Sequence, residues 1–567
     1  MMPACPSEGD KRYLLPAIFL PLAAVLGGLR AWGDFAAFSA IFFIYIAFFD
    51  DDFSFSGLGV WGLLAAWLGI SVAFSPEIRN SFWQFSKYAV LFSFYIFSSR
   101  RPIEARRAWA WSVFLLGGLA ACLSVYEGVL NLPRGSVLGF NPNYGAAFIA
   151  AALAGTVSLL MNAGCKKRWL GAAAGLALFS AGLLASNSRG GLLAALAALF
   201  YLLFLKKAWR PLLYLAAGLL LVTVLLPMEQ FRWMLKLDDP VSLERLKIWR
   251  TALGAIGDSP FFGYGPGLFE RVFEVLKFPF YNGISYYGHS TVHAHSELLN
   301  LAAEAGIPAA GLFIWGWSRA VFAADDGDRW GTVLKVFAVS LFAQSAVDII
   351  FYSGALQLFF FGTLGLLAAG KDRPADAPGS RVRALSLLLA CWCAAFILRS
   401  GFERDKACAL DGGISQRARE ACLKKAAVFA PGDAALLNVS IPLSFDIYGD
   451  FAYTAAVAGS AAMKRPRDPF PLFARAQAFY MAGALNSAKA ELYGVLALEP
   501  AFLRARLRLA EILSAETNYP AGVAQLRQIE SRLAGKGVEP RTAYDRDLLS
   551  LPAAPYAKIS KEIQRRE

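Results

Sequence analysis

The stretch at residues 143–162 reads NYGAAFIAAALAGTVSLLMN and contains no charged side chain. Folded as an α-helix, it is long enough to cross roughly 30 Å of hydrocarbon. Comparable apolar stretches recur from Tyr13 to about Leu398, and 57% of all residues are hydrophobic, which exceeds what a soluble fold can bury. The lipid bilayer is therefore the expected solvent for most of this chain.

We expect an all-α fold, a polytopic membrane helical bundle of about 12–13 transmembrane helices. The first apolar stretch has basic residues before it but no small-residue cleavage site after it, so it is expected to remain as a helix. The predicted spans are 13–29, 35–49, 57–74, 83–98, 108–127, 143–162, 169–186, 190–205, 211–227, 298–321, 332–351, 354–370 and 384–399.

The net charge of +13 is explained by topology, because the basic residues lie mostly in short loops between apolar stretches. No nucleic-acid partner is expected. Four basic clusters each follow an even-numbered span, so a cytoplasmic N-terminus places all of them in the cytoplasm, as the positive-inside rule requires. The clusters are Arg100, Arg101, Arg106 and Arg107; Lys166, Lys167 and Arg168; Lys206, Lys207 and Arg210; and Lys371, Arg373, Arg381 and Arg383.

This orientation predicts three regions in an inner-membrane protein. Residues 1–399 form a membrane domain, the loop 228–297 interrupts it on the periplasmic side, and residues 400–567 form a periplasmic tail. In that oxidising space Cys408 and Cys422 either form a disulfide or remain free thiols.

The tail is predicted to be a helical repeat domain. Pro431, Pro466 and Pro500 are spaced 35 and 34 residues apart, and a 34-residue period is the length of a tetratricopeptide repeat. The tail thus resembles degenerate tetratricopeptide repeats and would act as a binding or positioning module; an unrelated helical bundle with accidental spacing is the alternative. Residues that match at an offset of 34 are Ala476 and Ala510, Phe479 and Leu513, Ala490 and Ala524, and Leu492 and Leu526.

All three histidines of the chain, His289, His293 and His295, fall within seven residues at the end of the predicted external loop. Histidine is the side chain best suited to accept a proton near neutral pH, so a general base at the membrane surface is one interpretation. A zinc site is a second, although no neighbouring cysteine or carboxylate pattern completes it. A structural role at a helix start is the third. Glu297 follows the histidines closely enough to orient a base.

Two arginines in predicted external segments are candidates for anion binding. Arg189 lies in ASNSRGG (185–191), a short turn between apolar helices, where a guanidinium needs an anionic partner and suits phosphate oxygens. Alternatively, the Arg189 side chain extends along its helix and places its charge at the membrane–water interface. Arg245 lies in an amphipathic segment at 242–269, which in the simpler interpretation rests on anionic lipid head groups.

The tripeptide NPN at 141–143 precedes a predicted helix. Asn143 could bind a sugar or phosphate at the helix N-terminus. Its simpler role is that of an N-cap beside a proline turn.

Together these residues resemble the O-antigen ligase and polymerase superfamily over about residues 130–370. No single motif is specific to this superfamily. The set is specific because the motifs occur in this order and the large loop lies just before the histidines. The motifs are GFNPNYGA (139–146), SRGG (188–191), Arg245 and Trp249 followed by FFGYGPGLF (261–269), and HAHSELLNLAAEAGIPAAGLF (293–313).

The resemblance implies a metal-independent membrane glycosyltransferase that uses no cofactor and moves a glycan from a polyprenyl diphosphate to an acceptor hydroxyl. By motif match His295 would be the base, and Arg189 and Arg245 would bind the donor diphosphate. Ser296 stands where the family usually has Asn, which leaves His293 as a rival base. Asn143, Ser188, Trp249 and Glu297 would support the site.

The sequence is compatible with several alternatives. Within one mechanistic class the chain could be a ligase, a polymerase or a protein O-oligosaccharyltransferase, so the acceptor is a glycan, a lipid or a protein. From other classes, a transporter of lipid-linked glycans and a scaffold working through its tail are the alternatives. Membrane lipids, and an envelope protein bound by the tail, are the further partners expected.

Overall fold

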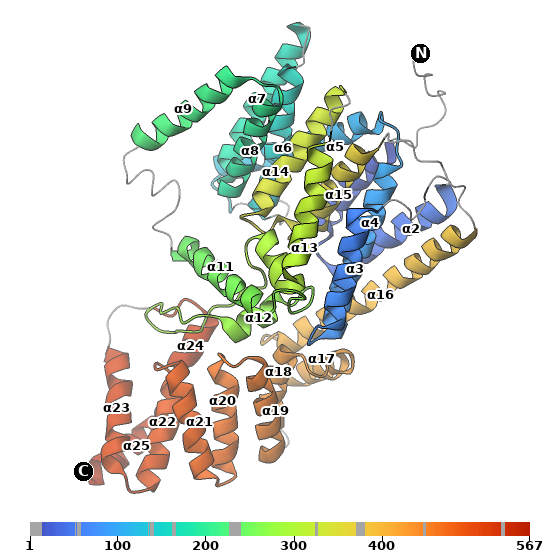
Figure 1. Cartoon of the computed structure of the whole chain (residues 1–567). Coiled ribbons are helices and arrows are strands. Elements are labelled where there is room, and N and C mark those ends of the chain that lie inside the picture. The colour runs from blue at the N-terminus through green and yellow to red at the C-terminus, as the bar shows by residue number, and fades with distance from the viewer. Residues whose placement is uncertain are drawn as a thin grey trace. The chain divides into compact units, whose positions relative to one another are not determined.

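The computed structural model describes residues 14–50, 53, 58–133, 135, 141–161, 166–225, 240–323, 327–369, 380–445, 449–534 and 539–566. Across these residues the chain is α-helical without a β-strand, which confirms the predicted all-α fold class (Figure 1). It divides into two compact units. The membrane unit comprises residues 1–269 and 293–400, and the C-terminal unit comprises residues 270–292 and 401–567.

Each span predicted from the sequence overlaps a helix that belongs to the membrane unit or starts in it. The predicted span 332–351 is the clearest difference, because its helix ends at Ser345 and a short 3-10 turn follows at Ile350–Tyr352. The helices are α1 (Leu15–Val25), α2 (Trp32–Phe49), α3 (Val60–Ala73), α4 (Ile78–Ser99), α5 (Ala105–Val129), α6 (Pro142–Met161), α7 (Lys166–Ser186), α8 (Arg189–Leu205), α9 (Trp209–Leu225), α11 (Pro240–Asp258), α13 (Glu297–Val321), α14 (Arg329–Ser345), α15 (Gly354–Ala368) and α16 (Ser380–Leu410).

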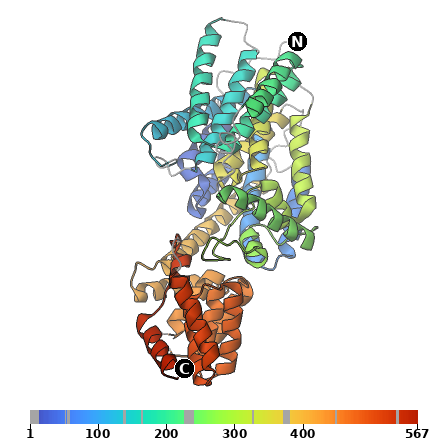
Figure 2. The same ribbon diagram turned by 90° about the vertical axis from the view of Figure 1, so that its left-hand side faces the viewer.

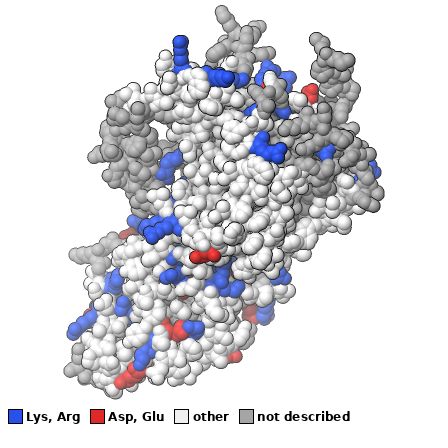
Figure 3. All heavy atoms as spheres, in the orientation of Figure 1, with Lys and Arg blue, Asp and Glu red and all other residues white. Residues whose placement is uncertain are grey.

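Among the described residues, five helical segments are long and apolar enough to cross a bilayer: Trp32–Phe49, Ala105–Val129, Pro142–Met161, Glu297–Val321 and Val382–Leu410. Large apolar side chains such as Phe48 (65% exposed) and Leu115 (67%) point out of the fold, which lipid tolerates and water does not. The face in Figure 3 is correspondingly poor in charge over the middle of the membrane unit. The chain is thus a polytopic helical membrane protein.

Small residues let the membrane helices approach closely, as expected where lipid gives no hydrophobic drive for association. Helix α6 packs on α5, α7, α8 and α14. A side chain at Gly117 of α5 would come within 2.7 Å of Ala152 of α6. One at Gly182 of α7 would come within 2.4 Å of Ala121 of α5. Small side chains therefore set the spacing around α6.

Two arginines of the first basic cluster are buried within the membrane unit. Arg101 pairs with Asp50, and Arg106 pairs with Asp328 at 3.2 Å while also donating to the carbonyl oxygens of Leu366 and Ala369. Removing one partner from a buried ion pair leaves an uncompensated charge. These arginines therefore hold helix ends together, in addition to any role in orienting the chain.

The C-terminal unit is built from helix pairs that stand side by side (Figure 2). The first helices of successive pairs begin at residues 434, 469 and 503, and the second helices begin at 451, 485 and 519. The period predicted from the prolines is thus also the spacing of helix starts. The helices are α17 (Gln416–Phe429), α18 (Ala434–Leu443), α19 (Phe451–Lys464), α20 (Pro469–Met481), α21 (Leu485–Leu498), α22 (Leu503–Ala515), α23 (Tyr519–Ala534), α24 (Ala543–Leu549) and α25 (Ala553–Arg566).

A disulfide between Cys408 and Cys422 joins the end of α16 to α17, which answers the question that the sequence left open. Beside it lies an apolar cluster that includes Phe402, Ala426 and Leu436. The cross-link ties the start of the C-terminal unit to its first packed helices.

Helix α13 is broken at Gly306, where the backbone has a φ of +85°. The Ile307 amide freed by the break donates to the carbonyl oxygen of Pro260 at 2.8 Å. A Cβ on Gly306 would lie 1.8 Å from the carbonyl oxygen of Phe261. The glycine-rich segment that follows α11 therefore packs directly into the break, and only glycine fits at this position.

We expect Gly306→Ala to destabilise the membrane unit by about 2 kcal/mol or more, from clash and backbone strain together. Gly311→Ala is the matched control, because Gly311 lies on the same helix and an added Cβ there meets no atom within 4 Å. Thermal unfolding of the purified variants in detergent checks this. Equal melting temperatures for the two variants would contradict the account.

Candidate functional site

Most candidate residues from the sequence lie at helix ends of the membrane unit, and Arg245 and Trp249 lie within a helix of it. Arg245, His293 and Glu297 contact the connection 346–353 between α14 and α15. Asn143 lies in the first turn of α6, Ser188 and Arg189 open α8, Arg245 and Trp249 lie on α11, and His293, His295 and Glu297 lead into α13.

Hydrogen bonds connect the NPN and SRGG segments. The Ser188 hydroxyl donates to Oδ1 of Asn143 at 2.7 Å and, as the N-cap of α8, accepts from the Gly191 amide at 3.1 Å. Gln344 of α14 donates to the carbonyl oxygen of Asn143 at 2.8 Å. The Asn143 amide donates to the side chain of Asn141 at 3.0 Å, so Asn141 caps this end while the Asn143 side chain joins α6 to α8.

Asp348 is a component of the site that the sequence reasoning missed. Its side chain is buried, and a Cβ on Gly190 would lie 3.3 Å from its Oδ2. The carboxylate therefore lies against the first turn of α8, beside the backbone of Arg189. An acidic residue inside a predicted apolar span was the available signal, because such residues are costly and usually functional.

Arg245 reaches the same connection from α11. Its guanidinium donates to the carbonyl oxygen of Val347 at 3.4 Å, one residue before Asp348. On the same helix, Trp249 donates through its indole N–H to the carbonyl oxygen of His295 at 3.4 Å. Helix α11 thus brings a cation to the Asp348 segment and fixes the backbone of the histidine segment.

His295 has a φ of +51°, a left-handed conformation that is uncommon for a residue other than glycine. Burial lowers its pKa below the ordinary value of 6.5, the Arg245 charge lowers it further, and the Asp348 charge opposes both. In the described part of the chain, its Nδ1 has no hydrogen-bond partner. His295 is therefore a neutral imidazole at neutral pH, in the same electrostatic environment as Arg245 and Asp348.

His293 packs edge-on against the ring of Tyr352 at 4.9 Å. Burial, followed by the charges of His295 and Lys87, lowers its pKa to about 4. A base works best when its pKa is near the working pH. The low pKa makes His293 the weaker candidate for the base, and its ring contacts Tyr352 in the same segment.

The acidic residues near the histidines connect segments of the backbone. Glu297 accepts from the Phe351 amide at 2.8 Å, which fastens the 346–353 connection to the start of α13. Glu304 accepts from the Phe269 amide at 3.2 Å, which fastens the glycine-rich segment to α13. Ser296 is the N-cap of α13 and accepts from the Leu299 amide. All three side chains therefore stabilise the backbone around the histidines.

An apolar cavity of about 300 Å³ lies next to this arrangement in the membrane unit. Its walls come mainly from α1, α5 and α6, and its polar residues include Asn141, Tyr144 and Ser353. Asn141 and Ser353 are close in the chain to Asn143 and the 346–353 connection. The cavity therefore offers apolar volume beside the polar helix ends.

A zinc site at the histidines would need several ligands close together. The described residues hold no group of three or more His, Cys, Asp or Glu side chains arranged to bind a metal ion. His289 belongs to the C-terminal unit, where its ring packs among Phe273, Phe278 and Phe280.

These features define a helical membrane protein in which His295, Arg245 and the buried carboxylate of Asp348 lie near the start of α8. The family model of O-antigen ligase matches residues 174–314 of the chain. That match includes the candidate residues from Ser188 to Glu297 and supports the O-antigen ligase superfamily, with a role in polysaccharide biosynthesis. No curated protein matches the chain in sequence.

The lowered pKa of His295 predicts the acid side of the pH profile. Its neutral form persists as the pH falls through 6.5, so the loss of activity at low pH should have its midpoint below 6.5. The measurement is kcat/KM for the reaction proposed below, as a function of pH. A midpoint at or above 6.5 would contradict the electrostatic environment described here.

Asp348→Asn should move that midpoint further down, because the Asp348 charge is the one that favours the imidazolium form. Asp258→Asn is the matched control, since Asp258 is exposed at the end of α11. An unchanged midpoint in Asp348→Asn would show that the carboxylate does not act on His295.

Proposed function

We propose that this protein is a membrane glycosyltransferase of the O-antigen ligase type that transfers a glycan from a polyprenyl diphosphate to an acceptor hydroxyl. The observation that supports this most is the meeting of His295, Arg245 and Asp348 beside the start of α8, where Arg189 lies. Cations can stabilise the negative charge of a diphosphate leaving group, and a neutral imidazole can accept the proton of a hydroxyl nucleophile.

The reaction is a single displacement at the sugar carbon. His295 removes the proton of the acceptor hydroxyl as its oxygen attacks the anomeric carbon. The bond between that carbon and the diphosphate oxygen breaks, and the diphosphate departs with the electron pair. Arg189 and Arg245 stabilise the charge that develops on it, which fixed cations do well in a site shielded from water. Asn143, Ser188 and Trp249 hold the segments that carry these groups.

The donor lipid and the acceptor follow from the same arrangement. The apolar cavity of about 300 Å³ suits the part of the polyprenyl chain nearest the diphosphate. We propose a ligase reaction in cell-surface polysaccharide biosynthesis, with membrane lipids around the protein. Transfer between glycans, as in a polymerase, or to a protein would use the same donor chemistry.

We place the site and the C-terminal unit on the periplasmic side of the inner membrane. Basic residues at the opposite helix ends favour this orientation by the positive-inside rule. The Cys408–Cys422 disulfide favours an oxidising compartment for the C-terminal unit. The repeated helix pairs of that unit suit an envelope protein partner as well.

Complementation of cells that lack the gene tests this function. His295→Ala should reduce glycan transfer about 10²- to 10⁴-fold, the usual contribution of a general base, with donor accumulating. Arg189→Ala and Arg245→Ala should each reduce it about 10²-fold or more. Arg250→Ala is the matched control, because Arg250 is an exposed arginine on the same helix as Arg245.

Membrane abundance of every variant is measured by blotting, so that loss of protein is not mistaken for loss of activity. Transfer at the wild-type rate by His295→Ala at normal abundance would refute the role of this site and favour a transporter or a scaffold. Retained anomeric configuration in the product would exclude single displacement.

A further inference from the structure

Residues 270–292, which we name the docking segment, form one compact unit with the C-terminal helices. The segment begins inside α12 (Phe269–Leu276) and continues at residue 293 into the two histidines of the site. In the sequence it is part of a long loop between membrane helices. In the fold its contacts are with helices from the other end of the chain.

The docking segment is itself folded. The rings of Phe273, Phe278 and Phe280 surround His289, with ring centroids 5.7, 4.9 and 6.0 Å from its own. The side chain of Asn282 accepts from the amide of Ser285 at 2.8 Å and so closes a tight turn. The C-terminal helices therefore contact a segment that has a defined conformation.

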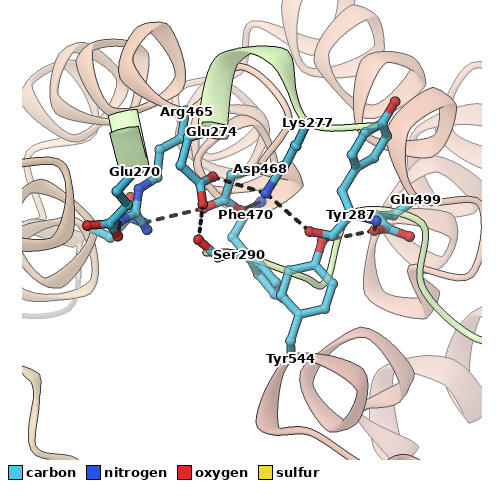
Figure 4. A network of polar contacts seen from close by, with 11 residues as sticks. Glu270, Glu274, Lys277, Tyr287, Ser290, Arg465, Asp468, Phe470, Glu499 and Tyr544 are labelled. Carbon is cyan, nitrogen blue, oxygen red and sulfur yellow. Dashed lines mark hydrogen bonds and ion pairs between the residues drawn. The ribbon is translucent and has the colours of Figure 1, made fainter. Parts of the chain in front are cut away.

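Glu499 is the central contact of the C-terminal helices with this segment. It lies between α21 and α22, its side chain is fully buried, and its two oxygens accept from the amides of Tyr286 at 2.8 Å and Tyr287 at 2.6 Å (Figure 4). The hydroxyl of Tyr544 donates to the same carboxylate at 2.9 Å. Charge-assisted hydrogen bonds of this kind are about twice as strong as neutral ones. Glu499 thus binds the main chain of the docking segment through hydrogen bonds.

Asp545 of α24 makes a second contact with the docking segment. It is buried, closes the cap of its own helix with Thr542, and accepts from the Ser285 hydroxyl at 2.9 Å and the Asn282 side chain at 3.4 Å. Two buried carboxylates from separate parts of the C-terminal unit, Glu499 after α21 and Asp545 on α24, thus hold the turn 282–287. Without it Glu499 would keep only the hydrogen bond from Tyr544 and Asp545 only its cap contacts with Thr542, which is costly because buried acceptors need partners.

A buried ion pair extends the network toward the histidines. Lys277 donates to Glu274 at 3.0 Å and to the carbonyl oxygen of Tyr287 at 3.2 Å, and Ser290 donates to the other oxygen of Glu274 at 2.6 Å (Figure 4). Only Thr291 and Val292 separate Ser290 from His293. Three residue steps span at most about 11 Å, so the hydrogen bonds of Ser290 restrict the chain just before the histidine segment.

We propose that the C-terminal helices bind residues 270–292 as a resident peptide, and that Glu499 and Asp545 are positioning residues for His295. This rests on the function proposed above and goes beyond it, because it gives the C-terminal unit a part in the transfer reaction. The face formed by Glu499 and Asp545 is then occupied by the chain itself. An envelope partner would bind elsewhere on this unit.

The test uses the full-length protein with Glu499→Gln, which keeps the size of the side chain but replaces one acceptor oxygen with an amide group. Amide hydrogen exchange at Tyr286 and Tyr287 should accelerate about tenfold or more, as expected when a buried hydrogen bond is lost. The kcat of glycan transfer should fall about 10- to 100-fold with little change in KM for the donor, because the base is misplaced.

Glu516→Gln is the matched control, since Glu516 is a partly exposed partner of Lys489 on the same helix pairs and should change neither measurement. Ser285→Ala is the second variant, because it weakens the Asp545 contact from the segment side and leaves the C-terminal helices unaltered. It should give the same changes in exchange and kcat at smaller size.

The outcomes separate the two ideas. Unchanged exchange at Tyr286 and Tyr287 in Glu499→Gln would overturn docking, and faster exchange with unchanged kcat would overturn positioning. Transfer by His295→Ala at the wild-type rate would overturn the proposed function and with it the positioning role. Exchange in Glu499→Gln would still decide whether the segment docks.

Discussion

The hydrocarbon of a bilayer offers no hydrogen-bond partner, so a helix end or break that lies within it must be satisfied by the protein itself. The polar residues of the candidate site follow from this constraint. Ser188 caps α8 and bonds Asn143, Glu297 satisfies the Phe351 amide, and the break at Gly306 is closed by Pro260. Groups that satisfy the backbone thereby bring the imidazole, arginines and carboxylate of the site to the same helix ends.

The charges around His295 determine its protonation state. Arg245 and Asp348 act on the pKa of His295 in opposite directions, while burial keeps the imidazole neutral. Such a site can accept a proton from a hydroxyl and still favour a negatively charged leaving group. The docking segment adds a constraint from outside the membrane unit, because buried carboxylates of the C-terminal helices hold the chain just before the histidines.

The sequence predicted the helices well because apolar length carries their signal directly. It also singled out His295, Arg189 and Arg245, whose residue types stand out in an apolar chain. Asp348 was missed because it lies inside a span predicted as one helix, whereas the structure ends that helix at Ser345. The docking segment left no signal in the sequence, since Glu499 binds main-chain amides and side-chain patterns do not record such contacts. Arg101 and Arg106 were interpreted through topology alone, although both are buried in ion pairs.

The most direct test of the account is to locate a bound, non-reactive polyprenyl-diphosphate glycan analogue by cryo-electron microscopy of the full-length protein in a lipid nanodisc. The account predicts diphosphate density between Arg189 and Arg245, the lipid entering the cavity lined by Tyr144, and the sugar facing His295. Diphosphate density elsewhere on the membrane unit, with these side chains unoccupied, would contradict it.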